Sequence, residues 1–491
     1  SGAGARRAGP MENAMPNSLA YLALIAWPLL AVGLFLWLSL ERAVIWSILG
    51  AYLVLPPVVA LDFPLLPPLD KVTIPNVAAL AICILLLGKR MAWLPKSTAG
   101  RVLAILFVFS PVATVLTNSD PIPFAIGGLP GLRIHDALSV TIQQTLALAP
   151  FLLARQFLAT EAAQREILLA LVVACLAYSI PMLIEIRLSP QINIWVYGFF
   201  QHDFTQTVRY GGYRPIVFLP HGLWVALFSM TALLAAVALW RHDAPRGRRF
   251  LAPMLYLWVL LALCKSVASL LYAAFLVPVI ALAGARIQVS LALLLAMIAV
   301  GYPLLRGADL VPARAIVARA ERIDPDRAQS LGYRFANEDV LLAKANEKPF
   351  FGWGSWGRNH VHDPISGRRL TITDGRWIIV IGTLGWFGYV GEFGLLALPL
   401  FMFWRMSRRG RGADLSPFVG PLALITGINL IDMLPNATLI PFTWLIAGSI
   451  LGHAEALAAS QGAAAPSVAA PAARLRADAS TAEARSSRTV L

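Results

Sequence analysis

The fold is decided by stretches such as residues 222–240, GLWVALFSMTALLAAVALW, in which nineteen consecutive residues carry no charge. A helix needs about 20 apolar residues to cross the hydrocarbon core of a bilayer. Similar runs recur along the 491 residues of the chain. The sequence therefore predicts an all-α integral membrane protein with about 12 or 13 transmembrane helices.

The expected spans share one pattern, an apolar run that ends in basic or turn-forming residues. They cover residues 18–40, 43–61, 72–88, 101–117, 137–156, 166–187, 222–240, 250–264, 266–284, 288–305, 386–404, 416–432 and 437–453. Thirteen spans would place the N-terminus outside despite Arg6 and Arg7, whereas twelve would keep it inside, and both counts stay open.

Composition agrees with a membrane protein and argues against a nucleic-acid-binding one. Hydrophobic residues make up 58% of the chain and charged residues 13%, about half the charged fraction of soluble domains. The net charge of +14 comes from basic residues at the ends of apolar runs, which is the pattern of cytoplasmic loops. We therefore expect membrane lipid, and no nucleic acid, as a partner.

The basic clusters also predict an organisation of the chain, because loops rich in Lys and Arg face the cytoplasm. The expected parts are an N-terminal tail (1–17), transmembrane helices with a short outer loop at 188–221 (18–305), a large outer loop that carries catalysis (306–385), C-terminal transmembrane helices (386–455) and a disordered cytoplasmic tail (456–491).

The shorter outer loop contains Arg209-Tyr-Gly-Gly-Tyr-Arg214, a compact cationic segment. Arginine is well suited to phosphate because its planar fork donates two parallel hydrogen bonds and stays charged. Arg209 and Arg214 are therefore candidate phosphate ligands, with a lipid-headgroup anchor as the alternative. His221 lies just before an expected span, where it can cap the helix or act in catalysis.

The larger outer loop is the most polar part of the chain, since residues 306–376 hold twelve Arg or Lys, nine Asp or Glu and two His. Arg334 and Glu338 are four residues apart on an expected helix, which predicts an intrahelical salt bridge. Both also remain site candidates. Asp374 can cap the next helix or accept a proton from a hydroxyl, and Arg376 lies two residues away.

Two further groups of polar residues are candidates for a site. His360, His362 and Asp363 indicate a metal site only weakly, because no further ligand cluster accompanies them, and we expect no metal or other cofactor. Lys265 at an outer turn and Glu392 within a span are ionisable groups at membrane depth, which face a cavity or a partner. They either line a site or pair with each other.

Three segments carry a resemblance to a known family. They are Arg209-Tyr-Gly-Gly-Tyr-Arg-Pro with the later Pro220-His-Gly, Arg334 with the later Lys348-Pro-Phe-Phe-Gly-Trp-Gly, and Thr373-Asp-Gly-Arg-Trp-Ile-Ile with the later Leu384-Gly-Trp-Phe-Gly. Together with the span pattern, they resemble the bacterial O-antigen polymerase and ligase superfamily, polytopic glycosyltransferases of the Wzy/WaaL type. The resemblance covers most of residues 18–455.

The resemblance implies a glycosyltransferase of the bacterial inner membrane whose active site faces the periplasm. It would polymerise oligosaccharides carried on undecaprenyl pyrophosphate, without metal and with inversion at the anomeric carbon. Other proteins of polysaccharide assembly would be further partners. The implied catalytic residues are Asp374, His221 and Glu338, and the implied ligands of pyrophosphate or sugar are Arg209, Arg214, Arg334, Arg376 and Lys265.

One departure from the family bears on the base. Its ligases use the histidine of a His-Asn pair, and Thr373-Asp374 stands at that place here. Either Asp374 is the base, or His221, His360 or His362 replaces it, or deprotonation of the acceptor is less demanding. The departure favours a polymerase over the second hypothesis, a ligase with a lipid or protein acceptor. The third hypothesis is a transporter or lipid flippase, although the paired halves typical of transporters are not evident.

Overall fold

The computed structural model describes residues 15–63, 66–322, 325–408 and 416–463. Most of the expected N-terminal tail (1–17) and C-terminal tail (456–491) lies outside these residues. The chain forms two compact units, Ser1–Ala454 and Glu455–Leu491. The arrangement described below is that of the first unit.

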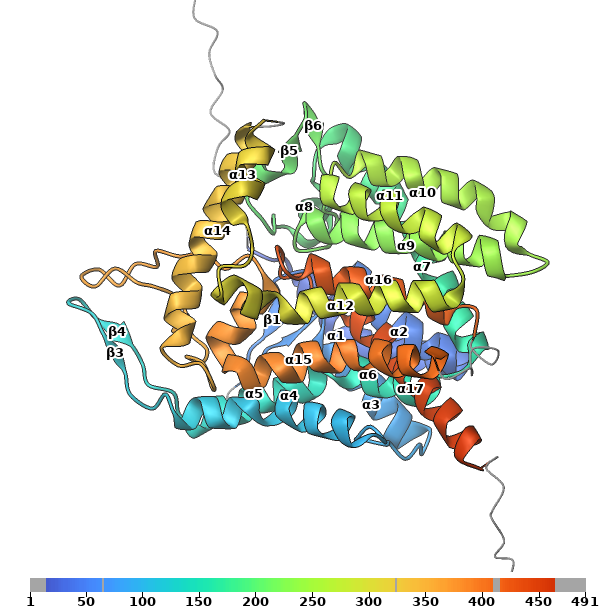
Figure 1. The fold of residues 1–491 in the computed structure, drawn as a ribbon, viewed down its shortest axis with the longest axis horizontal. Coiled ribbons are helices and arrows are strands. Elements are labelled where there is room, and N and C mark those ends of the chain that lie inside the picture. The colour runs from blue at the N-terminus through green and yellow to red at the C-terminus, as the bar shows by residue number, and fades with distance from the viewer. Residues whose placement is uncertain (1–14, 64–65, 323–324, 409–415, 464–491) are drawn as a thin grey trace, which may run out of the picture. The chain divides into compact units, whose positions relative to one another are not determined.

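Helices make up nearly all of the regular structure (Figure 1). In chain order they are α1 (Ser18–Trp37), α2 (Leu40–Val54), α3 (Thr73–Ala81) with the π-helix η1 (Ile82–Leu86), α4 (Thr98–Leu116), α5 (Ile134–Ala147), α6 (Ala149–Phe157), α7 (Glu161–Leu188), α8 (Ile192–Tyr197), α9 (Gly222–His242), α10 (Leu251–Leu263), α11 (Val267–Leu282), α12 (Ala285–Gly307), α13 (Ala313–Glu321), α14 (Pro325–Asn346), α15 (Arg376–Arg408), α16 (Val419–Asp432) and α17 (Pro441–Ala463). Two short 3-10 helices, η2 (Phe204–Thr207) and η3 (Gly247–Phe250), lie in loops.

The strands of the described residues form small antiparallel hairpins. They are β1 (Ala60–Leu61) with β2 (Leu69–Asp70), β3 (Ile122–Pro123) with β4 (Gly128–Leu129), and β5 (Val208–Arg209) with β6 (Gly212–Tyr213). The second hairpin is extended by the loop between α14 and α15, because the amide of Ala125 donates to the carbonyl of Pro364 at 2.9 Å.

Eight helical segments among the described residues are long and apolar enough to cross a membrane: α1, α4, the consecutive α5 and α6, α7, α9, α12, α15 and α17. Shorter apolar segments accompany them, namely α3 with η1, α11 and α16. The expectation of an all-α, multi-pass membrane protein is therefore confirmed.

Helix α9 is the most buried of these segments, because 89% of the residues in its apolar 18-residue stretch are buried. Its residues are apolar on every side, as expected of a helix that is surrounded by others. α7, α10 and α11 pack around it, while α12 packs on α15 and α16. In Figure 1 the green α9, α10 and α11 lie beside one another. These neighbours fix the position of α9, and with it the position of His221, which directly precedes the helix.

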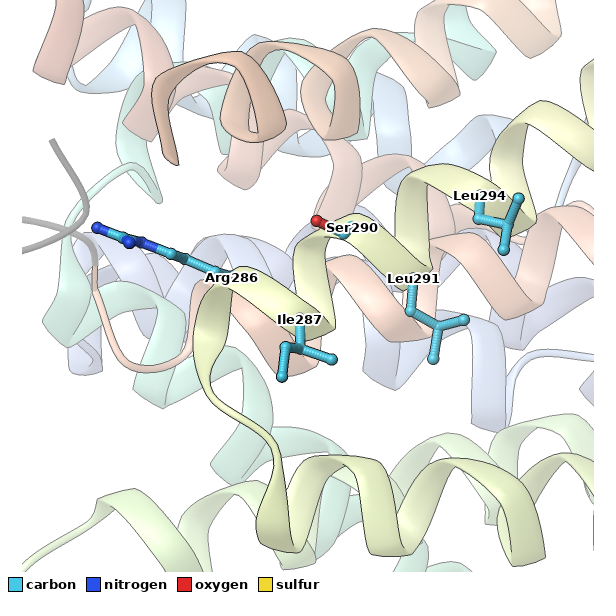
Figure 2. Close-up of a pocket in the computed structure, with 5 residues that line it drawn as sticks. All are labelled: Arg286, Ile287, Ser290, Leu291 and Leu294. Carbon is cyan, nitrogen blue, oxygen red and sulfur yellow. The ribbon is translucent and has the colours of Figure 1, made fainter. Parts of the chain in front are cut away.

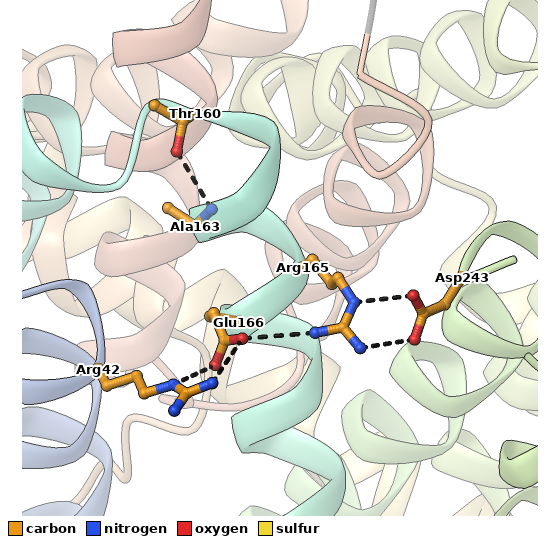
Figure 3. A network of polar contacts seen from close by, with 6 residues as sticks. All are labelled: Arg42, Thr160, Ala163, Arg165, Glu166 and Asp243. Atoms are coloured by element: carbon orange, nitrogen blue, oxygen red, sulfur yellow. Dashed lines mark hydrogen bonds and ion pairs between the residues drawn. The ribbon is translucent and has the colours of Figure 1, made fainter. Parts of the chain in front are cut away.

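The opposite end of α9 is tied to its neighbours by ion pairs (Figure 3). Arg42 at the start of α2 donates to Glu166 near the start of α7 at 2.9 Å, and Arg165 donates to Asp243 after α9 at 2.7 Å. The starts of α2 and α7 thus meet the end of α9. The loop of residues 188–221, which joins the end of α7 to the start of α9, consequently lies at the other end of the bundle.

Helix α15 is broken at Gly385, whose φ of 66° and ψ of −167° are accessible essentially only to glycine. Residues 349–354 fill the break, and the amide of Trp353 donates to the carbonyl of Gly382 at 2.9 Å. Backbone groups at the break are thus hydrogen-bonded within the protein, as the membrane interior requires. The sequence predicts that the polar loop ends at residue 385. In the structure, helix α15 begins earlier, at Arg376, and residue 385 is the position of its break.

Candidate active site at the two polar loops

The hairpin of β5 and β6 presents the arginines of the shorter loop. Tyr210 and Gly211 form its turn, with φ of 49° and 67°, the conformation that suits a two-residue hairpin turn. The Nη2 of Arg214 donates to the carbonyl of Lys265 at 3.0 Å, and the Nζ of Lys265 donates to the carbonyl of Arg209 at 2.8 Å. The structure therefore brings Arg209, Arg214 and Lys265 together.

Arg214 is the buried member of this cationic group, with 8% of its surface exposed. Its Nε has no hydrogen-bond partner among the described residues. Burial lowers the pKa of Arg214 and the charge of Arg209 lowers it further, but a guanidinium stays protonated in proteins. Gly222 leaves room for the side chain, because a Cβ there would collide with Cδ of Arg214. A buried cation with an unused donor is suited to an anionic ligand.

His221 is the N-cap of α9, since its Nδ1 accepts a hydrogen bond from the amide of Leu223 at 3.0 Å. Burial, together with the nearby charges of His202 and of the loop arginines, including Arg334, lowers the pKa of His221 to about 3. The ring is therefore neutral at physiological pH. Because Nδ1 accepts, the single ring proton resides on Nε2. In this arrangement His221 fills the capping role and can donate to a ligand, but it lacks a free lone pair to act as a base.

Arg334 on α14 contacts the segment that precedes α15. Its Nε lies 3.5 Å from Oδ2 of Asp374, and its Nη1 donates to the carbonyl of Pro435 at 3.2 Å. The predicted Arg334–Glu338 salt bridge is therefore wrong. The side chains of Arg334 and Asp374 are each 34% exposed, so both can reach a ligand at the surface of the loops.

Asp374 does not cap α15 in the way that its position suggested. The amide of Arg376, the first residue of α15, donates to the carbonyls of Met433 at 2.9 Å and Asn436 at 3.1 Å. Gly375 allows this close approach, because a Cβ there would collide with the carbonyl oxygen of Leu434. Asp374 is thus engaged by Arg334 alone among the ion pairs of the described residues, which leaves it available for chemistry.

Arg376 is committed to an internal partner. Its Nε and Nη2 donate to the two carboxylate oxygens of Glu392 at 2.7 and 2.6 Å, and Glu392 is fully buried. The alternative pairing of Glu392 with Lys265 is therefore wrong. The pair joins the two halves of α15 across the break at Gly385, and its bidentate geometry satisfies a carboxylate that would be costly to bury alone.

Asp432 is a buried carboxylate that sequence reasoning missed. It is 4% exposed at the end of α16, and it accepts hydrogen bonds from Thr438 at 2.6 Å and from Asn436 at 3.1 Å. These bonds shape the turn between α16 and α17, which receives Arg334 and the amide of Arg376. The signal in the sequence was an Asp at the end of an apolar run, followed by short polar side chains.

Glu338 faces the inside of the loop rather than Arg334. Tyr302 donates to its carboxylate at 3.1 Å, and the Nε of Arg306 lies 3.6 Å away. Burial raises the pKa of Glu338 to about 6, an effect that the Tyr302 hydrogen bond and the charge of Arg306 oppose. The structure thus separates Glu338 from the contacts that Arg334 makes with Asp374.

The histidines of the larger loop are held apart from Asp363. His360 Nδ1 lies 3.2 Å from Thr371 Oγ1, and the His362 ring packs on Phe124 with a centroid distance of 5.3 Å. The carboxylate of Asp363 accepts instead from backbone amides in its own turn. Among the described residues, no group of three His, Cys, Asp or Glu is placed to hold a metal ion.

Two surface hollows lie elsewhere in the protein. One, of about 360 Å³, lies along the first turns of α12 and is lined by Arg286, Ile287, Ser290, Leu291 and Leu294 (Figure 2). The other, of about 430 Å³, lies between α13 and α14 beside Arg306. The predicted site residues line neither hollow, so the candidate site is defined by its charged groups.

Comparison with known proteins leaves the family open. No model of a known protein family matches the chain, and no curated protein is significantly similar to it. The chemistry of the site therefore has to be inferred from its own residues.

Proposed function

We propose that the chain is a glycosyltransferase that joins undecaprenyl-pyrophosphate-linked oligosaccharide repeats into a polysaccharide at the periplasmic face of the bacterial inner membrane. One observation carries the proposal: Arg214 is buried beside Arg209 and Lys265, with a donor that nothing in the described protein uses. Arginines in this state suit the oxygens of a pyrophosphate. The resemblance of the loop motifs to O-antigen polymerases and ligases supports the same substrate.

In this proposal the cations hold the leaving group. Arg209, Arg214 and Lys265 bind the pyrophosphate from one side and Arg334 from the other, and they stabilise its charge as it departs. The neutral ring of His221 adds a hydrogen bond from Nε2. Arg376 and Glu338, which have internal partners, support the loop instead of the substrate.

Asp374 is the base in this proposal. A hydroxyl of the acceptor sugar attacks the anomeric carbon of the donor and transfers its proton to Asp374. The bond between that carbon and the pyrophosphate oxygen breaks, and the pyrophosphate takes the electron pair. Attack from the side opposite the leaving group inverts the configuration, and the step requires no metal.

We further propose thirteen membrane crossings, with the loops of residues 188–221 and 306–385 in the periplasm. The amide of Asn17 donates to the carbonyl of Tyr197 at 2.9 Å, so the start of α1 lies against the shorter loop. Successive helices would cross the membrane in opposite directions. Thirteen such crossings would place the N-terminus on the same side as both loops and the C-terminus in the cytoplasm.

The proposal is tested with purified protein in detergent and lipid-linked oligosaccharide repeats, with products followed by gel electrophoresis and mass spectrometry. We expect a ladder of multiples that remain linked to lipid pyrophosphate. Transfer of an intact glycan only to an added acceptor would instead identify a ligase. Failure of a panel of repeat structures to react, together with movement of labelled lipid between vesicle leaflets, would identify a transporter.

Metal removal provides a separate prediction. The rate of ladder formation should be unchanged in EDTA, because cationic side chains rather than a divalent ion hold the pyrophosphate. Loss of activity in EDTA that Mg²⁺ or Mn²⁺ restores would contradict the proposed role of the arginines.

A further inference from the structure

Residues 216–219 connect Arg214 to His221 without forming a helix or strand, yet buried side chains hold their backbone. Glu185, in the last turn of α7, is 1% exposed. Its Oε2 accepts hydrogen bonds from the amides of Ile216 at 2.7 Å and Val217 at 2.8 Å. The position of this short segment is therefore coupled directly to α7.

The same carboxylate also holds the beginning of the loop. Its Oε1 accepts from the amide of Ile192 at 3.1 Å. No ion pair of Glu185 occurs among the described residues, so backbone amides provide the stabilisation that a buried carboxylate needs. A single side chain of α7 thus ties together the first and last parts of the loop of residues 188–221.

Three other side chains complete this attachment. Tyr178, also on α7, accepts from the amide of Phe218 at 3.0 Å, and Lys71 donates to the carbonyl of Phe218 at 2.7 Å. Gln201 donates to the carbonyl of Val217 at 2.8 Å. A loop whose donors and acceptors are satisfied in this way has little freedom to move.

The backbone at Val217 shows how strongly the segment is constrained. Its φ is 54°, a conformation that is unfavourable for a β-branched residue. Such conformations persist where the surroundings determine them, and they concentrate at functional sites. The amide of Val217 is held by Glu185 and its carbonyl by Gln201.

We propose that Glu185 is a positioning residue that sets the placement of Arg214 and His221 by fixing the backbone between them. In the part of the chain that the structure describes, no hydrogen bond or ion pair joins Glu185 to the side chains of the cationic group, and Glu185 acts through Ile216 and Val217. This inference rests on the proposed function, because it assigns Arg214 and His221 to the binding of pyrophosphate.

The first test measures hydrogen exchange and needs no ligand. Glu185→Gln keeps the size of the side chain but replaces one acceptor oxygen with an NH₂ group. The amides of residues 216–217 should exchange about tenfold faster in this variant. The matched control is Glu166→Gln, on the same helix at the opposite end, which should leave those amides unchanged. Equal exchange rates of these amides in Glu185→Gln and in wild type would contradict the proposal that Glu185 holds this segment.

The second test measures binding of undecaprenyl pyrophosphate in detergent. Glu185→Gln should weaken binding about tenfold, whereas Glu166→Gln should not. In a background that carries both Arg214→Ala and His221→Asn, the added Glu185→Gln should have no further effect on the remaining binding, because its influence passes through these two residues. A merely structural role would weaken binding equally in both backgrounds.

The outcomes separate the two proposals. If wild-type protein binds and Glu185→Gln binds equally well, the positioning role of Glu185 is overturned and the proposed function stands. If wild-type protein does not bind undecaprenyl pyrophosphate, the proposed function fails, and the positioning role fails with it even if exchange at residues 216–217 increases.

Discussion

Arg334 pairs with Asp374, which is distant in sequence, and not with Glu338, which is one helical turn away. Glu338 is withdrawn from the surface because Tyr302 and Arg306 engage it in the interior of the loop. The arrangement leaves Asp374 partly exposed beside a cation, where the acceptor hydroxyl of the proposed reaction could approach. At the scale of residues, the partner of Arg334 therefore decides which carboxylate is open to a ligand.

His221 yields a prediction about pH. Its pKa is lowered to about 3 in the folded protein, chiefly by burial, from 6.5 in the unfolded chain. Between these values the unfolded state binds more protons, so stability falls as the pH decreases from 6.5 toward 3. At pH 5 the loss is about 2 kcal/mol.

The test replaces His221 by Asn, which cannot titrate and still provides an N-cap oxygen. Thermal unfolding in detergent should show that the midpoint of His221→Asn falls less than that of wild type between pH 7 and pH 5. Equal losses in the two proteins would mean that His221 is protonated in the folded state.

At the scale of elements, the break in α15 is the feature that shapes the larger loop. Residues 349–354 occupy the break, and Lys348 donates to Asn118 at 2.8 Å at the end of α4. Arg358, which is 2% exposed, donates to the carbonyl of Pro130 at 2.7 Å. These hydrogen bonds attach the larger loop to the segment after α4, at Asn118 and Pro130. The end of the loop, where Asp374 precedes α15, is thereby held in place.

Replacing Gly385 tests this element. Gly385→Ala forces a Cβ against the backbone of Phe350 in a conformation that alanine avoids. We expect a loss of about 3 kcal/mol or more in stability, seen as a lower thermal midpoint. The control is Gly301→Ala in α12, where a Cβ meets no atom within 4 Å, which should be neutral or stabilising. Similar midpoints for both variants would mean that α15 is not broken at Gly385.

The sequence predicts elements better than it predicts contacts. Apolar runs such as residues 222–240 indicated the helices because their signal is local and long. The hairpin arginines and Lys265 were recognised as candidates, but nothing local indicates that Lys265 contacts Arg209. Nothing local indicates the role of Glu185, because the amides of residues 216 and 217 reach it only in the fold. The partners of Asp432 are near in sequence, but nothing local indicates that the turn they shape receives Arg334.

At the scale of the whole molecule, the polar groups of the first unit gather at two ends of the helices. Ion pairs such as Arg165 with Asp243 lie at one end, and the cationic group around Arg214 lies at the other. The first group shows which helix ends meet. The second group lies among the loops that the proposal places in the periplasm.

This arrangement predicts which side of the membrane each loop faces. The three native cysteines are buried, so single exposed cysteines can be labelled selectively. Ile365→Cys and Met15→Cys, at positions 63% and 87% exposed, should react with a membrane-impermeant maleimide in spheroplasts. Leu94→Cys, at a position 47% exposed, should react only after lysis. Labelling of Met15→Cys only after lysis would contradict thirteen crossings.

The central claim, that the cationic group around Arg214 binds the pyrophosphate of a lipid-linked glycan, is tested most directly by ladder formation in single-site variants. Wild type should polymerise lipid-linked repeats, and Arg214→Ala should form no ladder although it accumulates in the membrane at the wild-type level. Arg286→Ala, at the hollow along α12, should behave as wild type. A normal ladder from Arg214→Ala would contradict the account.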